Sequence, residues 1–164
     1  MKLYYASADV AHADIVIYGL PFDKTSSFIP GSRLGPQYIR QCAENIEDFS
    51  PYQNKSLCDV NICDLGDIQF HSEDWLVDIE KKVSAMLHRE KIFIFLGGEH
   101  TVTFPVIKAF KQQCPKFSVV QFDAHCDLRD EYLGEKVCHA TTLRRVSEVV
   151  GIENVYQFGV RSGT

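Results

Sequence analysis

The chain has 164 residues, 45% of them hydrophobic, so it holds enough apolar material for one domain with its own core. Its formal net charge of −5 and its pI of about 5.6 offer no general basic footprint for a nucleic-acid backbone and suit a cationic small molecule better. No apolar stretch reaches the roughly 20 residues that span a bilayer. The first residues lack the apolar run of a signal peptide, and the six cysteines include no Cys-x-x-Cys pair. We therefore expect a cytoplasmic protein with reduced thiols and no membrane partner.

Strand and helix patterns alternate from the amino terminus onward. The compact apolar run Asp14–Leu20 predicts a first strand, and a loop rich in turn-forming residues follows it as far as Pro36. Pro36 is tolerated at the first position of a helix, and a short amphipathic helix is expected after it. The apolar residues at helical spacing in this segment are Tyr38, Ile39, Cys42 and Ile46. The weakest pattern, Asn54–Asp67, predicts an edge strand that closes at Gly66.

The second half of the chain continues the alternation. Residues Glu73–Arg89 predict the clearest helix, with Ser72 as its amino-terminal cap. The later predictions are a strand at Ile92–Leu96, a helix from Thr101 onward, a buried strand that includes Val119, Val120 and Phe122, a helix within Ala140–Val150 that buries Leu143, Val146 and Val150, and a last strand at Asn154–Val160. This order predicts one α/β domain over residues 1–164, with a mainly parallel sheet covered on both faces.

Metal-ligating side chains follow two of the buried strands. Asp123, His125 and Asp127 come at every second position, so on an extended backbone they point the same way. His100 follows the strand Ile92–Leu96, and neighbouring parallel strands would bring it to the same edge. Two imidazoles and two carboxylates suit Mn²⁺, Zn²⁺ or Fe²⁺, and the oxygen-rich set favours Mn²⁺. These four residues are predicted metal ligands, with Asp123 able to bridge two ions.

His139 is the candidate proton carrier. It follows a charged, glycine-containing loop from Leu128 to Val137, and its titration near neutral pH suits proton transfer to a leaving amine. A helix-capping role for this histidine is equally compatible with the sequence. Cys126 lies between two predicted ligands, so on an extended path its thiol faces away from them and serves packing.

Several segments resemble the consecutive signatures of the ureohydrolase family, which holds arginases and agmatinases. The main matches are Gly97-Gly98-Glu99-His100-Thr101, Asp123-Ala124-His125-Cys126-Asp127 and Cys138-His139-Ala140-Thr141. Further segments, Gly19-Leu20-Pro21-Phe22-Asp23, Pro30–Pro36, Leu128–Tyr132 and Thr142–Arg145, resemble the agmatinase branch most closely.

The resemblance implies a three-layer α/β/α, arginase-like fold and an enzyme that cleaves a guanidino group to urea and an amine. For an agmatinase this is agmatine to putrescine, a step of polyamine biosynthesis, by hydroxide attack at a dimanganese centre. By position, His100 and Asp127 would hold one Mn²⁺, His125 the other, and Asp123 would bridge them. His139 would match the family's acid/base histidine. A homo-oligomer, trimer or hexamer, is implied as well.

One family motif is absent. The second ligand motif, Ser-x-Asp-x-Asp-x-x-Asp-Pro, occurs nowhere in the sequence. We therefore expect the amino-terminal portion of a longer ureohydrolase domain, which alone has little or no activity and binds Mn²⁺ weakly. The alternatives are a non-catalytic metal-binding or oligomerising fragment, an arginase or guanidinobutyrase with a different substrate, and a single-zinc amide hydrolase of the deacetylase type.

Overall fold

The computed structural model describes residues 1–71, 74–88 and 90–163, and the chain divides into two compact units. The first comprises Met1–Asp23, Gly31–Gln69 and Leu87–Gly98, and the second Lys24–Pro30, Phe70–Met86 and Glu99–Thr164. Apart from one short antiparallel pair, the described strands pair in parallel, and they alternate with helices, which confirms the predicted α/β class. Among the described helices, none combines the length and apolar character that crossing a membrane requires. The cysteines are all free thiols, as expected.

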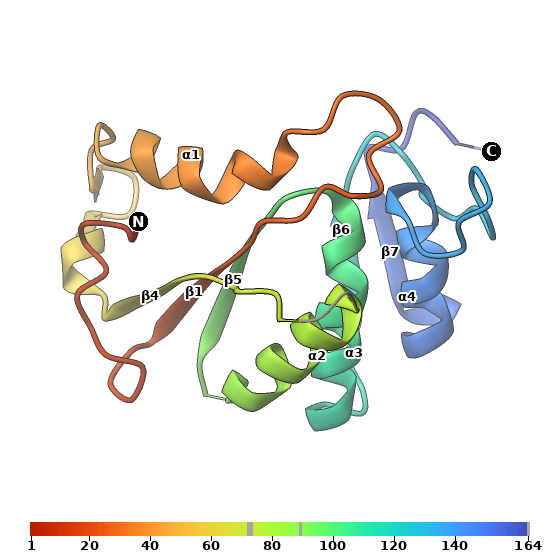
Figure 1. Ribbon diagram of the computed structural model, residues 1–164. Helices are drawn as coiled ribbons and strands as arrows, with labels where there is room; N and C mark the ends of the chain where they lie inside the picture. Colours follow the sequence, from red (N-terminus) through yellow and green to blue (C-terminus); the bar gives the residue numbers. More distant parts are fainter. Residues whose placement is uncertain (72–73, 89, 164) are drawn as a thin grey trace. The chain divides into compact units, whose positions relative to one another are not determined.

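The first unit is built on a three-stranded parallel sheet (Figure 1). Its strands are β1 (Ile15–Leu20), β4 (Ile62–Asp67) and β5 (Ile92–Gly97), in the order β4-β1-β5. Ile15 of β1 pairs with Ile62 on one side and with Ile92 on the other. β4 therefore forms an edge of this sheet, where the sequence predicted its weakest strand.

Two features of this unit, a short antiparallel strand pair and a close backbone approach at Gly98, cannot be predicted from the spacing of apolar residues. A short antiparallel pair, β2 (Phe49–Ser50) and β3 (Lys55–Ser56), follows the helix α1 (Gly35–Ala43) in the chain and precedes β4; it was not predicted. At the end of β5, a side chain on Gly98 would place its Cβ 2.0 Å from the carbonyl oxygen of Phe22. Gly98 thus lets two backbone segments approach closely, and its N–H donates to Leu20 O at 2.9 Å.

The helix α1 (Gly35–Ala43) forms where it was predicted but buries a different side. The four residues of the expected apolar side, Tyr38, Ile39, Cys42 and Ile46, are exposed, whereas Arg40 is fully buried. The Arg40 guanidinium donates two hydrogen bonds to the Asp64 carboxylate, at 2.7 and 2.9 Å, and one to Asp67 at 2.5 Å. A paired charge therefore decides which side of this helix faces inward.

The buried carboxylate of Asp64 makes the stability of the first unit depend on pH. Burial alone would raise its pKa, but hydrogen bonds from Arg40, from the Gly66 and Leu3 N–H groups, and the Arg40 charge hold the pKa below its usual value. Because the pKa of Asp64 is lower in the folded state, its ionisation stabilises that state fully at a pH above the pKa in the unfolded chain, about 3.9. This contribution is lost as the pH falls through the lower pKa of the folded state.

We expect the free energy of unfolding to decline as the pH is lowered below about 4. In a ¹³C NMR titration, the Asp64 carboxyl should respond at a pH below the ordinary aspartate value of about 3.9. A titration midpoint at or above that value would contradict the assignment of Asp64 as the ionised partner of Arg40.

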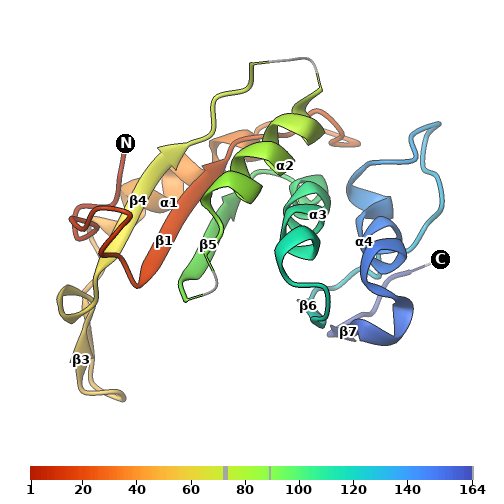
Figure 2. The same cartoon turned by 90° about the horizontal axis from the view of Figure 1, so that it is seen from below.

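The second unit packs helices against a two-stranded parallel sheet (Figure 2). Its elements are α2 (Trp75–Met86), α3 (Thr103–Gln113), β6 (Val119–Phe122), α4 (Thr142–Val150) and β7 (Val155–Phe158). Its short 3-10 turns are His100–Val102, His139–Thr141 and Ile152–Asn154, and those of the first unit are Ser32–Leu34 and Leu57–Asp59. The predicted helix and cap positions Ser72, Glu73 and Arg89 lie outside the described residues.

The core of this unit contains the α4 residues that the sequence predicted. Leu143, Val146 and Val150 are buried and pack against Ile107 of α3 and Val119 of β6. The spacing of three and four residues places them on one side of the helix, so this prediction is confirmed.

The strand β6 differs from the prediction in what it buries. Val120 is 53% exposed and Phe122 82% exposed, whereas Gln121 between them is buried. Side chains alternate along a strand, and the α3 and α4 side receives Val119 and Gln121. On the other side, Phe122 stacks on Phe158 of β7 with ring centroids 5.5 Å apart. The described parallel strands thus fall into two hydrogen-bonded groups, β4-β1-β5 in the first unit and β6-β7 in the second.

Candidate metal centre

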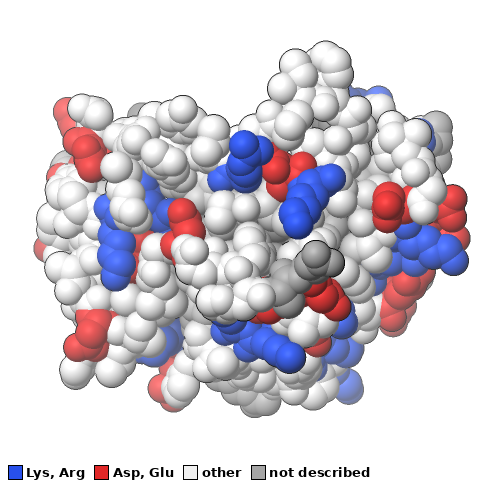
Figure 3. All heavy atoms as spheres, viewed as in Figure 1, with Lys and Arg blue, Asp and Glu red and all other residues white. Residues whose placement is uncertain are grey.

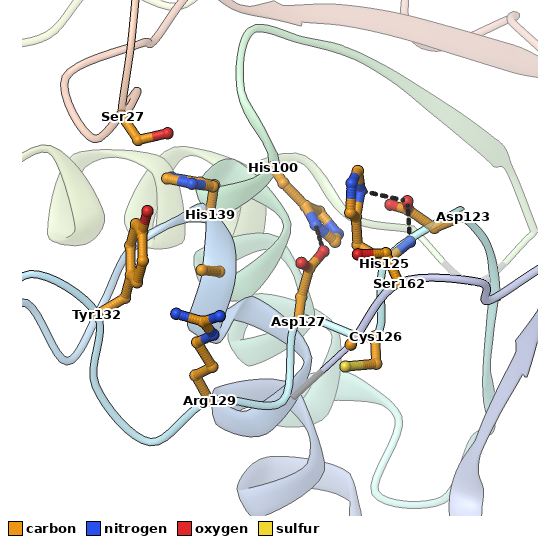
Figure 4. A pocket seen from close by; sticks show the side chains of 12 residues that line it. Ser27, His100, Asp123, His125, Cys126, Asp127, Arg129, Tyr132, His139 and Ser162 are labelled. Atoms are coloured by element: carbon orange, nitrogen blue, oxygen red, sulfur yellow. Dashed lines mark hydrogen bonds and ion pairs between the residues drawn. The ribbon is translucent and has the colours of Figure 1, made fainter.

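The predicted site residues all belong to the second unit, where they surround one cavity (Figure 4). The cavity has a volume of about 450 Å³. Its lining includes all four predicted ligands and His139, namely His100, Asp123, His125, Asp127 and His139, together with Ser27, Cys126, Arg129, Tyr132 and Ser162. The metal-ligating pattern and the candidate proton carrier, separated in sequence, are thus brought to the same space.

Three of the predicted ligands converge on a small volume. His100, Asp123 and Asp127 each offer one ligand atom, and these atoms lie within 4.8 Å of one another. His100 Nδ1 lies 2.7 Å from Asp127 Oδ2. The backbone is not extended throughout as expected, since Asp127 has a φ of +50°, in the left-handed region that aspartate tolerates. The N–H of Arg144 donates to the carbonyl oxygen of Asp127 at 3.2 Å and helps to hold this turn.

His125 lies beside the three-residue group without belonging to it. Its N–H donates to Asp123 Oδ1 at 2.9 Å, and its ring Nδ1 lies 3.2 Å from the same oxygen. The His125 side chain is 64% exposed. His125 therefore contacts the carboxylate that was predicted to bridge two ions, from the solvent side.

Asp123 is held by neighbours that the sequence pattern does not predict. Gln121 Nε2 donates to Asp123 Oδ2 at 3.3 Å, and Gln157 Nε2 donates to Gln121 Oε1 at 2.5 Å. Burial would raise the pKa of Asp123, but the His125 N–H, the charge of His100 and the side chains of His125 and Gln121 lower it below its usual value. The signal that could have revealed Gln121 is a polar residue inside an otherwise apolar strand.

His139 opens the 3-10 turn before α4, and Thr25 contacts it twice. Its ring Nδ1 lies 2.7 Å from the carbonyl oxygen of Thr25, and its N–H donates to Thr25 Oγ1 at 3.2 Å. The Tyr132 ring meets the imidazole edge to face, with centroids 5.7 Å apart. Cys138 is the residue that caps the turn, so the His139 side chain turns to Thr25 and the cavity instead of capping a helix.

The donor set fits a divalent cation of the first transition row. Two carboxylates and one imidazole with ligand atoms within 4.8 Å of one another match the oxygen-rich, mixed environment that Mn²⁺ accepts. An octahedral ion takes six ligands, so three side chains leave several positions for water or other groups. The geometry is thus that of part of a coordination sphere.

Two further cavity residues, Arg129 and Tyr132, contact each other. The Arg129 guanidinium lies over the Tyr132 ring, 4.9 Å from its centroid. Both side chains line the cavity, and both belong to the segment Leu128–Tyr132 of the family resemblance, which implies no role for them. At the far end of the same loop, Leu133 and Gly134 both have positive φ, and Tyr132 and Glu135 exchange backbone hydrogen bonds across this tight turn.

On the face of the molecule shown in Figure 3, positive and negative side chains are interspersed. Lysines and arginines lie close to aspartates and glutamates on this face and do not gather into one area. This mixed pattern agrees with the formal charge of −5 and is typical of an ordinary solvated surface.

Comparisons with known proteins agree with one another. A profile described as the arginase family matches residues 13–164. An agmatinase from Bacillus subtilis (strain 168) is 43% identical over 166 residues, covering 99% of this chain and 57% of that protein. Among solved structures, a putative agmatinase from Clostridium difficile has a TM-score of 0.89 and 36% identity, covering 95% of this chain and 58% of that one. The agmatine ureohydrolase of Thermoplasma volcanium has a TM-score of 0.88 and 35% identity, covering 99% and 55%. The chain thus spans a little over half the length of these relatives.

Proposed function

The chain belongs to the arginase family, and from this premise we propose that it forms part of an agmatinase-like active site that hydrolyses a guanidino group to urea and an amine. The observation that carries the proposal is the convergence of His100, Asp123 and Asp127 within 4.8 Å, in a cavity that His139 also lines. Ligands and a proton carrier on one cavity are the two components that a metal-assisted hydrolysis requires.

The metal ligands proposed are His100, Asp123, His125 and Asp127, for two Mn²⁺ ions in a complete site. Bound ions would supply Lewis acidity and an activated water molecule. The lowered pKa of Asp123 keeps its carboxylate ionised and able to hold a cation. His125 would contribute to holding the second cation, which its contact with Asp123 supports.

The chain's own residues would also handle the proton and the substrate. We propose that His139 exchanges a proton with the leaving amine, since it lies on the cavity and an imidazole can both accept and donate a proton. Agmatine is the substrate proposed, with putrescine and urea as products, supported by the 43% identity to an agmatinase. A homo-oligomer in the cytoplasm is proposed on the family resemblance alone.

A urea assay with Mn²⁺ tests this proposal, using agmatine, arginine and guanidinobutyrate as substrates. The chain alone is expected to release little urea, because four protein ligands are few for two octahedral ions. A chimera completed with the carboxyl-terminal part of the Bacillus subtilis relative should release urea, and fastest from agmatine. A folded, Mn²⁺-loaded chimera that releases no urea from any of the three would contradict the proposal.

Metal counting separates the remaining alternatives. Two Mn²⁺ per completed chain agree with the ureohydrolase proposal, and one Zn²⁺ would instead favour an amide hydrolase of the deacetylase type. A tight oligomer with no turnover, even in the completed chain, would favour a non-catalytic metal-binding role.

A further inference from the structure

We propose that Thr25 and Glu99 are positioning residues that hold the His139 imidazole in one tautomer, with the proton on Nδ1 and the lone pair on Nε2. The inference concerns the second unit only, to which all three residues belong. It rests on the proposed function only in giving His139 a proton to exchange. The orientation of the ring follows from the contacts themselves.

The tautomer follows from the partner of Nδ1. A backbone carbonyl oxygen has no proton to donate, so the 2.7 Å contact between His139 Nδ1 and Thr25 O is a hydrogen bond only when Nδ1 carries the proton. In the neutral ring the other nitrogen, Nε2, then holds a lone pair. Because His139 lines the cavity, this arrangement offers a proton acceptor to a bound molecule.

Thr25 is itself held by Glu99. Thr25 Oγ1 donates to Glu99 Oε1 at 2.5 Å, and Thr25 N–H donates to the same oxygen at 3.3 Å. The other carboxylate oxygen accepts from Thr101, from its N–H at 2.8 Å and from its hydroxyl at 2.5 Å. Thr101 is completely buried, so the Glu99 carboxylate is fixed on a rigid support.

These bonds connect into one chain of donors and acceptors. The Thr25 hydroxyl donates its single proton to Glu99 and accepts from the His139 N–H, at 3.2 Å. Both the backbone and the ring of His139 are therefore tied to one residue, whose own position Glu99 sets. Outer residues that fix the tautomer of a working histidine in this way are a recurrent feature of sites that transfer protons.

The arrangement also gives the glutamate of Gly97-Gly98-Glu99-His100 a function beyond capping. Glu99 caps the 3-10 turn that starts at His100, through the Thr101 N–H. A cap needs only one of its two oxygens, and the second oxygen is used entirely for Thr25. One carboxylate thus ties the turn that begins at a predicted metal ligand to the proton carrier.

Two-bond ¹H–¹⁵N correlation spectra of the ¹⁵N-labelled chain test the proposal without metal or substrate. At a pH of about 8.5, two units above the ordinary histidine pKa of about 6.5, imidazoles of this type are neutral and each tautomer gives its own pattern. The His139→Asn variant identifies the His139 signals by their loss. We expect the Nδ1–H form to exceed the Nε2–H form by about tenfold, the ratio that one hydrogen bond of ordinary net strength produces.

The variants separate positioning from mere folding. Thr25→Val removes the hydroxyl at nearly constant volume and Glu99→Gln replaces the acceptor pair, so both should move the ring toward an average of the two tautomers. Thr25→Ser keeps the hydroxyl and should retain the wild-type pattern. A wild-type ring in the Nε2–H or averaged form would overturn the proposal even if a variant fails to fold. An unchanged ring in both Thr25→Val and Glu99→Gln would overturn the role of these two residues.

This test and the urea assay fail independently. A ring fixed with Nδ1–H in a completed chain that releases no urea would leave the positioning inference standing and refute the proposed reaction. A completed chain that releases urea but whose His139 ring averages the two tautomers would refute the positioning inference and leave the proposed reaction standing.

Discussion

Replacement of Arg40 by methionine is expected to lower the free energy of unfolding by about 3–5 kcal/mol, the usual cost of removing one partner of a buried ion pair. Arg40 and Asp64 are both fully buried, and the guanidinium also donates to Asp67 and to the carbonyl oxygen of Gly66, at 3.0 Å. Methionine fills similar space but leaves the Asp64 carboxylate in the interior without a counter-charge. Urea denaturation monitored by circular dichroism measures the change.

Two further variants show whether charge or volume is responsible. The double variant Arg40→Met, Asp64→Asn removes both charges and should recover part of the loss. Arg144→Met breaks an exposed pair with Glu148, at 3.2 Å, and should change the free energy of unfolding by at most about 1 kcal/mol. Equal losses for Arg40→Met and Arg144→Met would show that the buried pair contributes no more than a surface one.

The Asp127→Asn variant is expected to bind Mn²⁺ at least about 10–100-fold more weakly, because even outer-shell substitutions cost that much in metal affinity. Asp127 supplies one of the three converging ligand atoms, and asparagine keeps the size of the side chain while removing its charge. Isothermal titration calorimetry with Mn²⁺ and the electron paramagnetic resonance signal of free Mn²⁺ measure the affinity.

Asp130→Asn is the matched control for that experiment. Asp130 lies in the same loop, pairs with Arg145 at 2.5 Å and does not line the cavity. The change removes the same charge from the chain but should leave the Mn²⁺ affinity within about twofold, since exposed charges are screened by salt. Equal weakening in the two variants would mean that net charge, and not the converging ligands, attracts the ion.

Helix and strand positions could be predicted where apolar spacing alone decides them. In α4, Leu143, Val146 and Val150 face the core as the pattern requires. In α1 the same reasoning selects the wrong side, because the buried residue is Arg40 and its partners lie 24 and 27 positions further along the chain. A pattern of hydrophobic residues carries no information about such a partner.

The site could be predicted to the level of its residue types but not of its backbone. The pattern correctly predicts that His100, Asp123 and Asp127 lie together. It also predicts an extended backbone, whereas Asp127 has a left-handed φ of +50°. Single residues in that region depend on local hydrogen bonds such as the one from Arg144. Thr25 was not identified as a partner of His139, because the two are 114 positions apart.

The Gln121 and Gln157 side chains set the register of β6 against β7. Gln121 and Gln157 lie directly opposite each other in β6 and β7 and bond through their side chains. Shifting the register of either strand by one residue would turn its glutamine away from α3 and α4 and turn an aromatic ring toward them. The lost hydrogen bond and the misplaced ring both disfavour such a shift. The hydrogen bond between Gln121 and Gln157 therefore fixes the register of the two strands. That register in turn fixes the position of Asp123, two residues after Gln121.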